Sequence, residues 1–236
     1  MNDSTIDSLV ALYEERRYIF KRFLNNINDF FLLEPSLNEG NLPIIHSIKH
    51  RLKDPEHLRK KLARKISKGK MINCENLFSQ VTDLAGIRIL HLHRKQFEPI
   101  HHFIMQIVAQ GDWVLGEQPV AYMWDPEIEE YFKGFDLRTE VKETFYTSVH
   151  YIVQSPSDSR VQCEIQVRNL FEEAWGEIDH AINYPQQTTS HSCLEQIRVL
   201  SKLVGAGSRL ADSIFSEHSR SCAETHSESG QLNESS

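Results

Sequence analysis

The sequence is poor in cysteine and has no long apolar run, and each shortage excludes a class of protein. Its four cysteines are scattered with no CxxC pair, so neither a disulfide framework nor a cysteine metal site is indicated, and a reduced, cytoplasmic protein is expected. No apolar stretch approaches the roughly 20 residues that cross a bilayer, and no charged-then-apolar leader opens the chain. We therefore expect no membrane partner.

The sequence also lacks an overall positive charge, but its basic residues are concentrated. The chain has 26 Lys and Arg against 33 Asp and Glu, a net charge of −7, which argues against a protein that coats nucleic acid. Residues 46–70 nevertheless hold ten basic and two acidic residues. Such a patch is what a polyanion needs when it approaches an acidic protein, although a solvated helix face has the same composition.

Hydrophobic periodicity predicts both helices and strands. An apolar 3.6-residue repeat predicts a helix over 5–32, and Asp54 followed by Pro55 marks the start of another over 54–68. The remaining predicted elements are strands over 86–91, 147–154 and 160–168 and helices over 101–109, 169–182 and 194–215.

These elements divide the chain into four parts. We expect an N-terminal helical segment over 1–40, a main domain over 41–190, a C-terminal helix over 191–215 and a disordered tail over 216–236. The tail is rich in Ser, Glu and His and has too few apolar residues to offset the entropy of ordering. Residues 111–140 mix aromatic residues, acids and Gly, which suggests a long mobile insertion.

Two strands carry residues suited to chemistry. In VQCEIQVR (161–168), a period of two places Glu164, Gln166 and Arg168 on one face, as a floor for phosphates or as an ordinary exposed sheet face. Tyr146 and His150 share a face of the other strand, where the tyrosine is either a stacking platform for a base or a half-buried sheet residue. Asp83, before the strand over 86–91, is a metal ligand or a turn residue.

Four blocks in this order resemble the RelA/SpoT family. They are HSIKHRLKDPEHLRKKL (46–62), DLAGIRIL (83–90), KETFYTSVHYIV (142–153) and CEIQVRNLFEEAWGEIDHAINY (163–184). The resemblance is to the (p)ppGpp synthetase domain, and above all to single-domain small alarmone synthetases. It implies an α+β fold, with a mixed β-sheet flanked by helices, related to nucleotidyltransferases.

The resemblance also implies roles for matching positions. Asp83 and Glu164 are implied to be catalytic and to hold Mg²⁺, with Glu164 as the base for a 3′-hydroxyl. ATP is implied to bind Arg51, Lys53, Arg59, Lys61 and Arg88. The acceptor nucleotide is implied to bind Lys142, Tyr146, His150, Gln166, Arg168, His180 and Asn183.

The implied activity is transfer of the β,γ-pyrophosphate of ATP to the 3′-hydroxyl of GDP or GTP, which makes (p)ppGpp. No His-Asp pair of the family's hydrolase is present, so synthesis alone is expected. A toxic relative that modifies tRNA 3′ ends or adenine nucleotides, and a silent nucleotide-binding regulator, remain alternatives. Phe145 stands where the family usually has Gly, which leaves the acceptor's identity open. The terminal helices would build a homo-oligomer or cover a monomer core.

Overall fold

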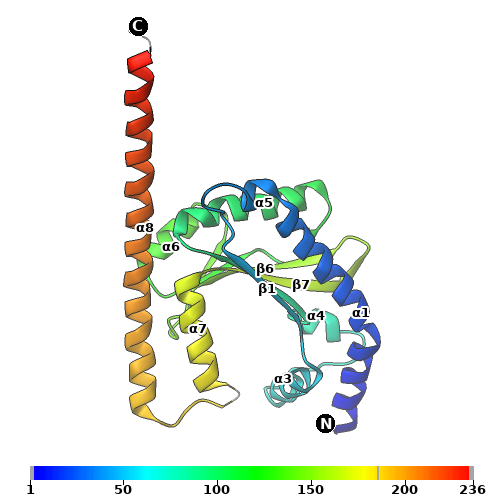
Figure 1. Ribbon diagram of the computed structural model, residues 1–236. Helices are drawn as coiled ribbons and strands as arrows, with labels where there is room; N and C mark the ends of the chain where they lie inside the picture. Colours follow the sequence, from blue (N-terminus) through cyan, green and yellow to red (C-terminus); the bar gives the residue numbers. More distant parts are fainter. Residues whose placement is uncertain (1–2, 185, 234–236) are drawn as a thin grey trace.

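The computed structural model describes residues 3–184 and 186–233 as one mixed β-sheet flanked by helices, which confirms the α+β prediction (Figure 1). The helices are α1 (Asp3–Leu33), α2 (Pro35–Asn38), α3 (Pro55–Ser67), α4 (Leu77–Gln80), α5 (Phe97–Gln110), α6 (Pro126–Lys133), α7 (Leu170–Asn183) and α8 (His191–Asn233). The strands are β1 (Ser47–Leu52), β2 (Ala85–His91), β3 (Val114–Leu115), β4 (Val120–Met123), β5 (Arg138–Val141), β6 (Ser148–Ser155) and β7 (Asp158–Asn169).

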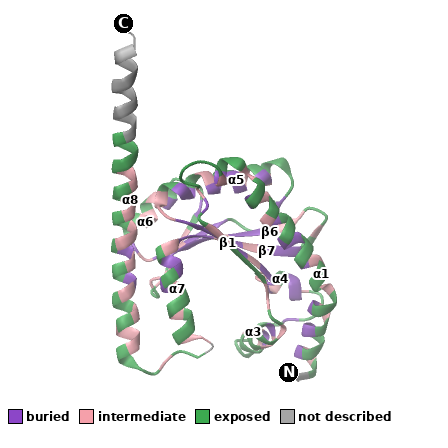
Figure 2. Ribbon diagram, in the orientation of Figure 1, coloured by how far each residue is buried: buried purple, intermediate pink, exposed green. Residues whose placement is uncertain are grey.

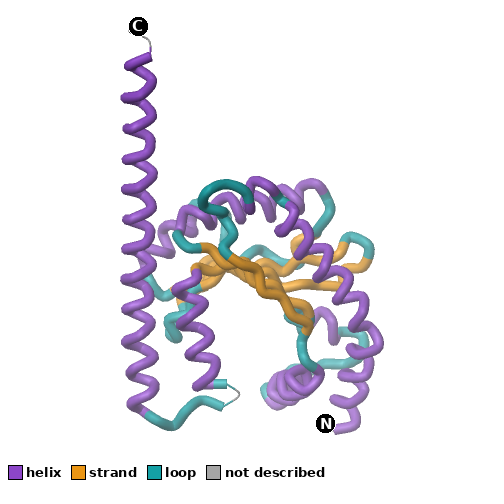
Figure 3. The backbone as a smooth tube through the Cα atoms, in the orientation of Figure 1, coloured by secondary structure: helices purple, strands orange, loops and turns teal. Residues whose placement is uncertain are grey.

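The strand order is β1-β2-β7-β6-β4-β5, and β3 pairs with β6. The β2–β7 and β4–β5 pairs are parallel, and the other pairs are antiparallel. Helices α1 and α5 lie on one side of the sheet, whereas α7 lies on the other side with α8 alongside it (Figure 3). The two faces of the central strands therefore meet different surroundings.

Alternation along the strands separates the core from a polar face. Ile87, Ile165 and Tyr151 are fully or almost fully buried in the hydrophobic core, to which α1 and α5 also contribute. Figure 2 shows buried stretches along β6 and β7. The predicted N-terminal helix is confirmed as α1, whose apolar residues pack into this core. The start of α3 is also confirmed, because Asp54 Oδ1 accepts hydrogen bonds from the backbone N–H of Glu56 and His57. The strand residues between these buried positions point to the opposite face of the sheet, where a site can form.

The prediction of a mobile insertion over 111–140 was wrong. This segment forms β3, β4, α6 and β5, and both Trp113 and Met123 are fully buried. Trp113 packs against the rings of Phe30 and Phe31 at the end of α1. The elements are too short for periodicity to reveal them, and their partners lie far away in the sequence.

The C-terminal helix differs from its prediction in length. The predicted helix ends at residue 215 with a disordered tail beyond it, whereas α8 runs to Asn233 as one helix. Adding a residue to an existing helix avoids the cost of nucleation, so a weakly apolar sequence can follow a docked first half. The predicted tail's last residues, 234–236, lie outside the described residues. Neither α8 nor any other helix in the described ranges is long and apolar enough to cross a membrane.

Candidate active site

The strand register assembles a row of polar residues on the face away from the core. Lys49 pairs with Arg88, Arg88 with Gln166, and Gln166 with His150, so one row crosses β1, β2, β7 and β6. A second row places Gly86 beside Glu164. No element was predicted over residues 47–52, which form β1.

A cavity of about 180 Å³ lies over these rows. Gly86 has no side chain to fill the space next to Glu164, and a Cβ there would meet only a backbone oxygen, at 3.9 Å. The cavity is lined by Lys49, His50, Arg51, Asp83, Gly86, Ile87, Arg88, Glu164, Gln166, Glu177 and His180. The two predicted catalytic acids thus share one cavity.

A second hollow, of about 360 Å³, shares Arg51, Asp83 and His180 with the first. It is lined in addition by Leu52, Lys53, Asp54, His57, Lys61, Arg64 and Tyr184. The predicted ATP-binding lysines lie here, and Arg51 connects the two spaces. Positive charge therefore borders the acids on the side of α3.

Asp83 is held between two lysines. Lys53 Nζ lies 2.7 Å from Oδ2, and Lys61 Nζ lies 2.7 Å from Oδ1. Burial alone would raise the pKa of Asp83, but the two ammonium groups outweigh it and lower that pKa from 3.8 to about 2. Asp83 is therefore a carboxylate at any physiological pH.

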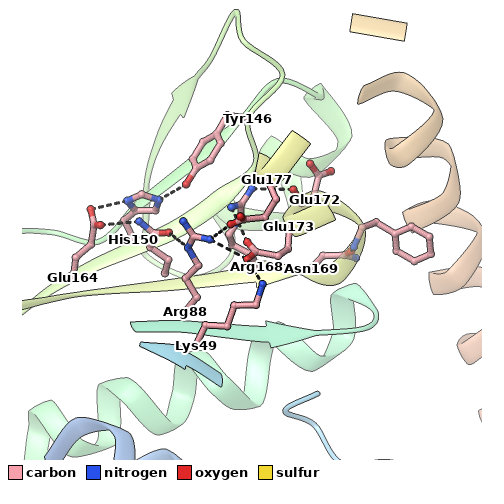
Figure 4. A network of polar contacts seen from close by, with 12 residues as sticks. Lys49, Arg88, Tyr146, His150, Glu164, Arg168, Asn169, Glu172, Glu173 and Glu177 are labelled. Atoms are coloured by element: carbon pink, nitrogen blue, oxygen red, sulfur yellow. Dashed lines mark hydrogen bonds and ion pairs between the residues drawn. The ribbon is translucent and has the colours of Figure 1, made fainter. Parts of the chain in front are cut away.

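Glu164 is held by two donors on its own sheet face (Figure 4). His150 Nδ1 lies 3.2 Å from Oε1, and Gln166 Nε2 donates to Oε2 at 2.7 Å. Burial would raise the pKa of Glu164, but the hydrogen bond from His150 and the charge of that ring lower it overall. Glu164 is thus ionised at neutral pH and able to accept a proton.

Tyr146 borders this pair on the side of His150. Its hydroxyl lies 3.0 Å from His150 Nε2, and the guanidinium of Arg168 lies 4.8 Å from its ring centre. The preceding residue, Phe145, has a φ of 59°, in the left-handed region that favours glycine. Its ring packs edge-on against Trp124 at 5.1 Å, which holds it there. The loop thus adopts a glycine-like backbone without a glycine.

Glu173, which was not among the predicted site residues, reaches from α7 to cations on three strands of the site (Figure 4). Its Oε1 accepts from Lys49 at 3.0 Å and from Arg88 at 2.9 Å, and its Oε2 accepts from Arg168 at 2.9 Å. Arg88 also pairs with Glu177. A helix acid is usually a solvent-exposed residue, and only the register of the strands below reveals this role.

Two predicted residues are turned to other partners. Arg59, assigned to ATP, pairs with Asp7 of α1 and lines neither cavity. Asn183, assigned to the acceptor, donates to Asp179 Oδ1 at 2.8 Å and accepts from a following backbone N–H. Asn183 therefore fixes the end of α7.

Two further predicted residues lie at the edges of the site. Lys142 Nζ lies 4.3 Å from the ring centre of Tyr122, which contacts His150, and it pairs with Glu140. Lys142 lines neither cavity. His180, assigned to the acceptor, lines both cavities and stacks on Tyr184 at 4.6 Å. His180 lies on the lysine-rich side.

The donor set fits magnesium. Mg²⁺ takes one or two carboxylates together with substrate phosphate oxygens, and Asp83 and Glu164 line one cavity among cations that suit phosphates.

The fold and the site define a class: a mixed-sheet protein with a cation-lined, two-carboxylate cavity suited to phosphorylated nucleotides. The model of the family described as "Region found in RelA / SpoT proteins" matches residues 50–189, more than half of the chain. The chain belongs to this family.

Solved structures share the fold. Small alarmone synthetase 1 from Bacillus subtilis has a TM-score of 0.62 at 18% identity, with 88% of this chain and 98% of that chain covered. A GTP pyrophosphokinase family protein from Streptococcus pneumoniae has a TM-score of 0.61 at 16% identity, with 90% and 93% covered. The Bacillus protein bound to its product pppGpp has a TM-score of 0.58 at 21% identity, with 89% and 96% covered. No curated protein matches the chain.

Proposed function

We propose that this chain transfers the β,γ-pyrophosphate of ATP to the 3′-hydroxyl of GDP or GTP and so makes ppGpp or pppGpp. One observation carries the proposal: Asp83 and Glu164 line a single cavity, Lys53 and Lys61 contact Asp83, and His150 connects Glu164 to Tyr146. Family membership supports it, as do similar structures bound to pppGpp and to AMPCPP. The proposal is for synthesis alone.

The donor is assigned to the lysine side. Lys53 and Lys61 are placed for its phosphates, and Arg51, at the junction of the two spaces, offers a guanidinium plane for adenine. Arg88, on β2, lines the cavity that holds both acids. Phosphoryl-type transfer needs fixed positions and neutralised charge more than a strong nucleophile, and this arrangement supplies both.

The acceptor is assigned to the tyrosine side. A guanine base stacks on Tyr146, and its ribose 3′-hydroxyl faces Glu164. Glu164 takes the hydroxyl proton, the 3′-oxygen bonds to the β-phosphorus of ATP, and the bond between that phosphorus and the α–β bridging oxygen breaks to release AMP. Mg²⁺ held by Asp83 and Glu164 would neutralise charge on the phosphates.

Self-association is proposed through α8. Four large apolar side chains along this helix are 56–64% exposed: Val199, Leu203, Leu210 and Ile214. Their spacing keeps them on one side of a helix that docks on α7, and such a stripe suits a second copy of the chain. Light scattering of the intact protein should show an assembly, and Leu203→Glu with Leu210→Glu should reduce it to monomers.

The activity is tested by offering β,γ-labelled ATP and Mg²⁺ with GDP, GTP, ATP or bulk tRNA in separate reactions. Label should move to GDP or GTP. Glu164→Gln should abolish transfer, whereas Glu75→Gln, the same change at an exposed site, should not. Label that moves only to tRNA or ATP would show that the acceptor assignment is wrong and that pyrophosphate transfer is still the reaction. Binding of nucleotide without transfer to any acceptor would refute the proposal and favour a silent regulator.

A further inference from the structure

The carboxylates of the two predicted magnesium ligands are already surrounded by other side chains of the protein. Both oxygens of Asp83 lie 2.7 Å from a lysine ammonium, one from Lys53 and one from Lys61. Glu164 receives a hydrogen bond from Gln166 on Oε2, and its Oε1 faces His150 at 3.2 Å. Each oxygen that a metal would use is therefore already engaged by the chain itself.

The charge around Asp83 also opposes a free divalent cation. The hollow on its lysine side is lined by four Lys or Arg residues and by two Asp residues. Mg²⁺ gives up its water reluctantly and needs carboxylates that accept it without competition. A cation that approached Asp83 would meet two ammonium groups already in contact with the carboxylate.

The described side chains offer no preformed metal site. Across residues 4–184 and 186–221, no group of three or more His, Cys, Asp or Glu side chains is arranged to hold a metal ion. A divalent cation therefore needs ligands that the chain alone does not offer. Phosphate oxygens are the ligands that a bound triphosphate would add.

A triphosphate would remove the obstacle and supply the missing ligands together. Lysine is a compact charge on a flexible stem, and it pairs with a phosphate as well as with a carboxylate. We infer that Lys53 and Lys61 close Asp83 to metal in the free protein and open it by exchanging onto the triphosphate. Binding of the triphosphate and of the divalent cation is then positively coupled, and the coupling is reciprocal.

The inference rests on the proposed function only in assigning Asp83 to a metal and the lysines to donor phosphates. It is independent of the acceptor and of whether transfer occurs. The inference predicts a gain rather than a loss of metal affinity. Removal of two predicted substrate-binding lysines should create a metal site that the unliganded wild type lacks.

The inference is tested by titrating Mn²⁺ into the full chain without nucleotide. Electron paramagnetic resonance measures the free Mn²⁺, and the bound fraction follows by difference. The wild type should bind no Mn²⁺ up to millimolar concentration. Lys53→Met with Lys61→Met should bind at least tenfold more tightly, and a further Asp83→Asn change should abolish that binding. Lys60→Met, the same change at an exposed position of α3, should behave as the wild type.

Wild type that binds Mn²⁺ as tightly as the double variant would overturn the inference, as would a folded double variant that binds none. Thermal unfolding identifies a variant that fails to fold, and Lys61→Met alone then carries the comparison. The pyrophosphate-transfer assay fails or succeeds separately. Loss of transfer with the expected Mn²⁺ behaviour would reject the proposed reaction and leave the lysine exchange standing.

Discussion

Replacing Glu173 by Gln should destabilise the protein far more than the same change at an exposed acidic residue of a helix. Glu173 and Arg168 are each only 3% exposed at the side chain and lie 2.9 Å apart. The change leaves the buried guanidinium of Arg168 without its charged partner and also releases Lys49 and Arg88. Breaking a buried ion pair from one side costs about 3–5 kcal/mol, so we expect the free energy of unfolding to fall by that amount.

Glu177→Gln is the matched control. Glu177 lies one helical turn further along α7 and pairs with the same Arg88, but its side chain is 53% exposed. Exposed ion pairs contribute about 0–1 kcal/mol, so this variant should lose no more than that. Urea unfolding of both variants measures the difference.

The pH dependence of the Glu173 effect has a defined sign. Burial would raise the pKa of Glu173, but Arg168 and Arg88 outweigh it and lower that pKa below its ordinary value of 4.5. A lowered carboxyl pKa contributes stability that is present above 4.5 and lost as the pH falls. The gap between wild type and Glu173→Gln should therefore narrow in acid. A loss below 1 kcal/mol at neutral pH, or a gap that widens in acid, would refute this account of the network.

Three further predictions concern the cavity, the loop and a buried acid. Gly86→Val should keep the fold, since a Cβ meets nothing closer than 3.9 Å and valine suits a strand, yet it should abolish ATP binding measured by calorimetry because it fills the cavity. Phe145→Val should raise the acceptor KM about tenfold in steady-state assays, because a β-branched residue resists the left-handed φ of 59° that Gly would accept; an unchanged KM would contradict this. Burial raises the pKa of Glu172 from 4.5 to about 7, so the folded protein holds an extra proton between these values and loses stability as the pH rises through them. Glu172→Gln should remove that slope and be more stable than wild type by about 2–3 kcal/mol at pH 8, measured in urea, while equal stabilities there would refute it.

Strong periodic segments were predictable from the sequence. The helix that became α1 and the strands that became β6 and β7 follow from apolar repeats, and the cap at Asp54 follows from its Pro55 neighbour. The lateral order of the strands does not follow from the sequence, because β2 pairs with β7 across most of the domain. For the same reason the short elements within 111–140 were missed.

The sequence predicted several residues of the site better than it predicted which side chains they contact. Period two put Glu164 and Gln166 on one face, and they do share a cavity with Asp83. Nothing local marked Glu173, whose three cations come from three separate strands. Nor did the sequence reveal that Arg59 faces α1, since that contact depends on how two helices dock.

Phosphorus-31 magnetic resonance of protein mixed with ATP, GDP and Mg²⁺ tests the central claim most directly. Pyrophosphate transfer predicts AMP and, in equal amount, a guanine nucleotide that carries two phosphates on its 3′-oxygen. ADP with inorganic phosphate, or ADP with a 3′-monophosphorylated product, would show that the bond between the β- and γ-phosphates breaks instead. Either result would contradict the roles assigned to Asp83 and Glu164.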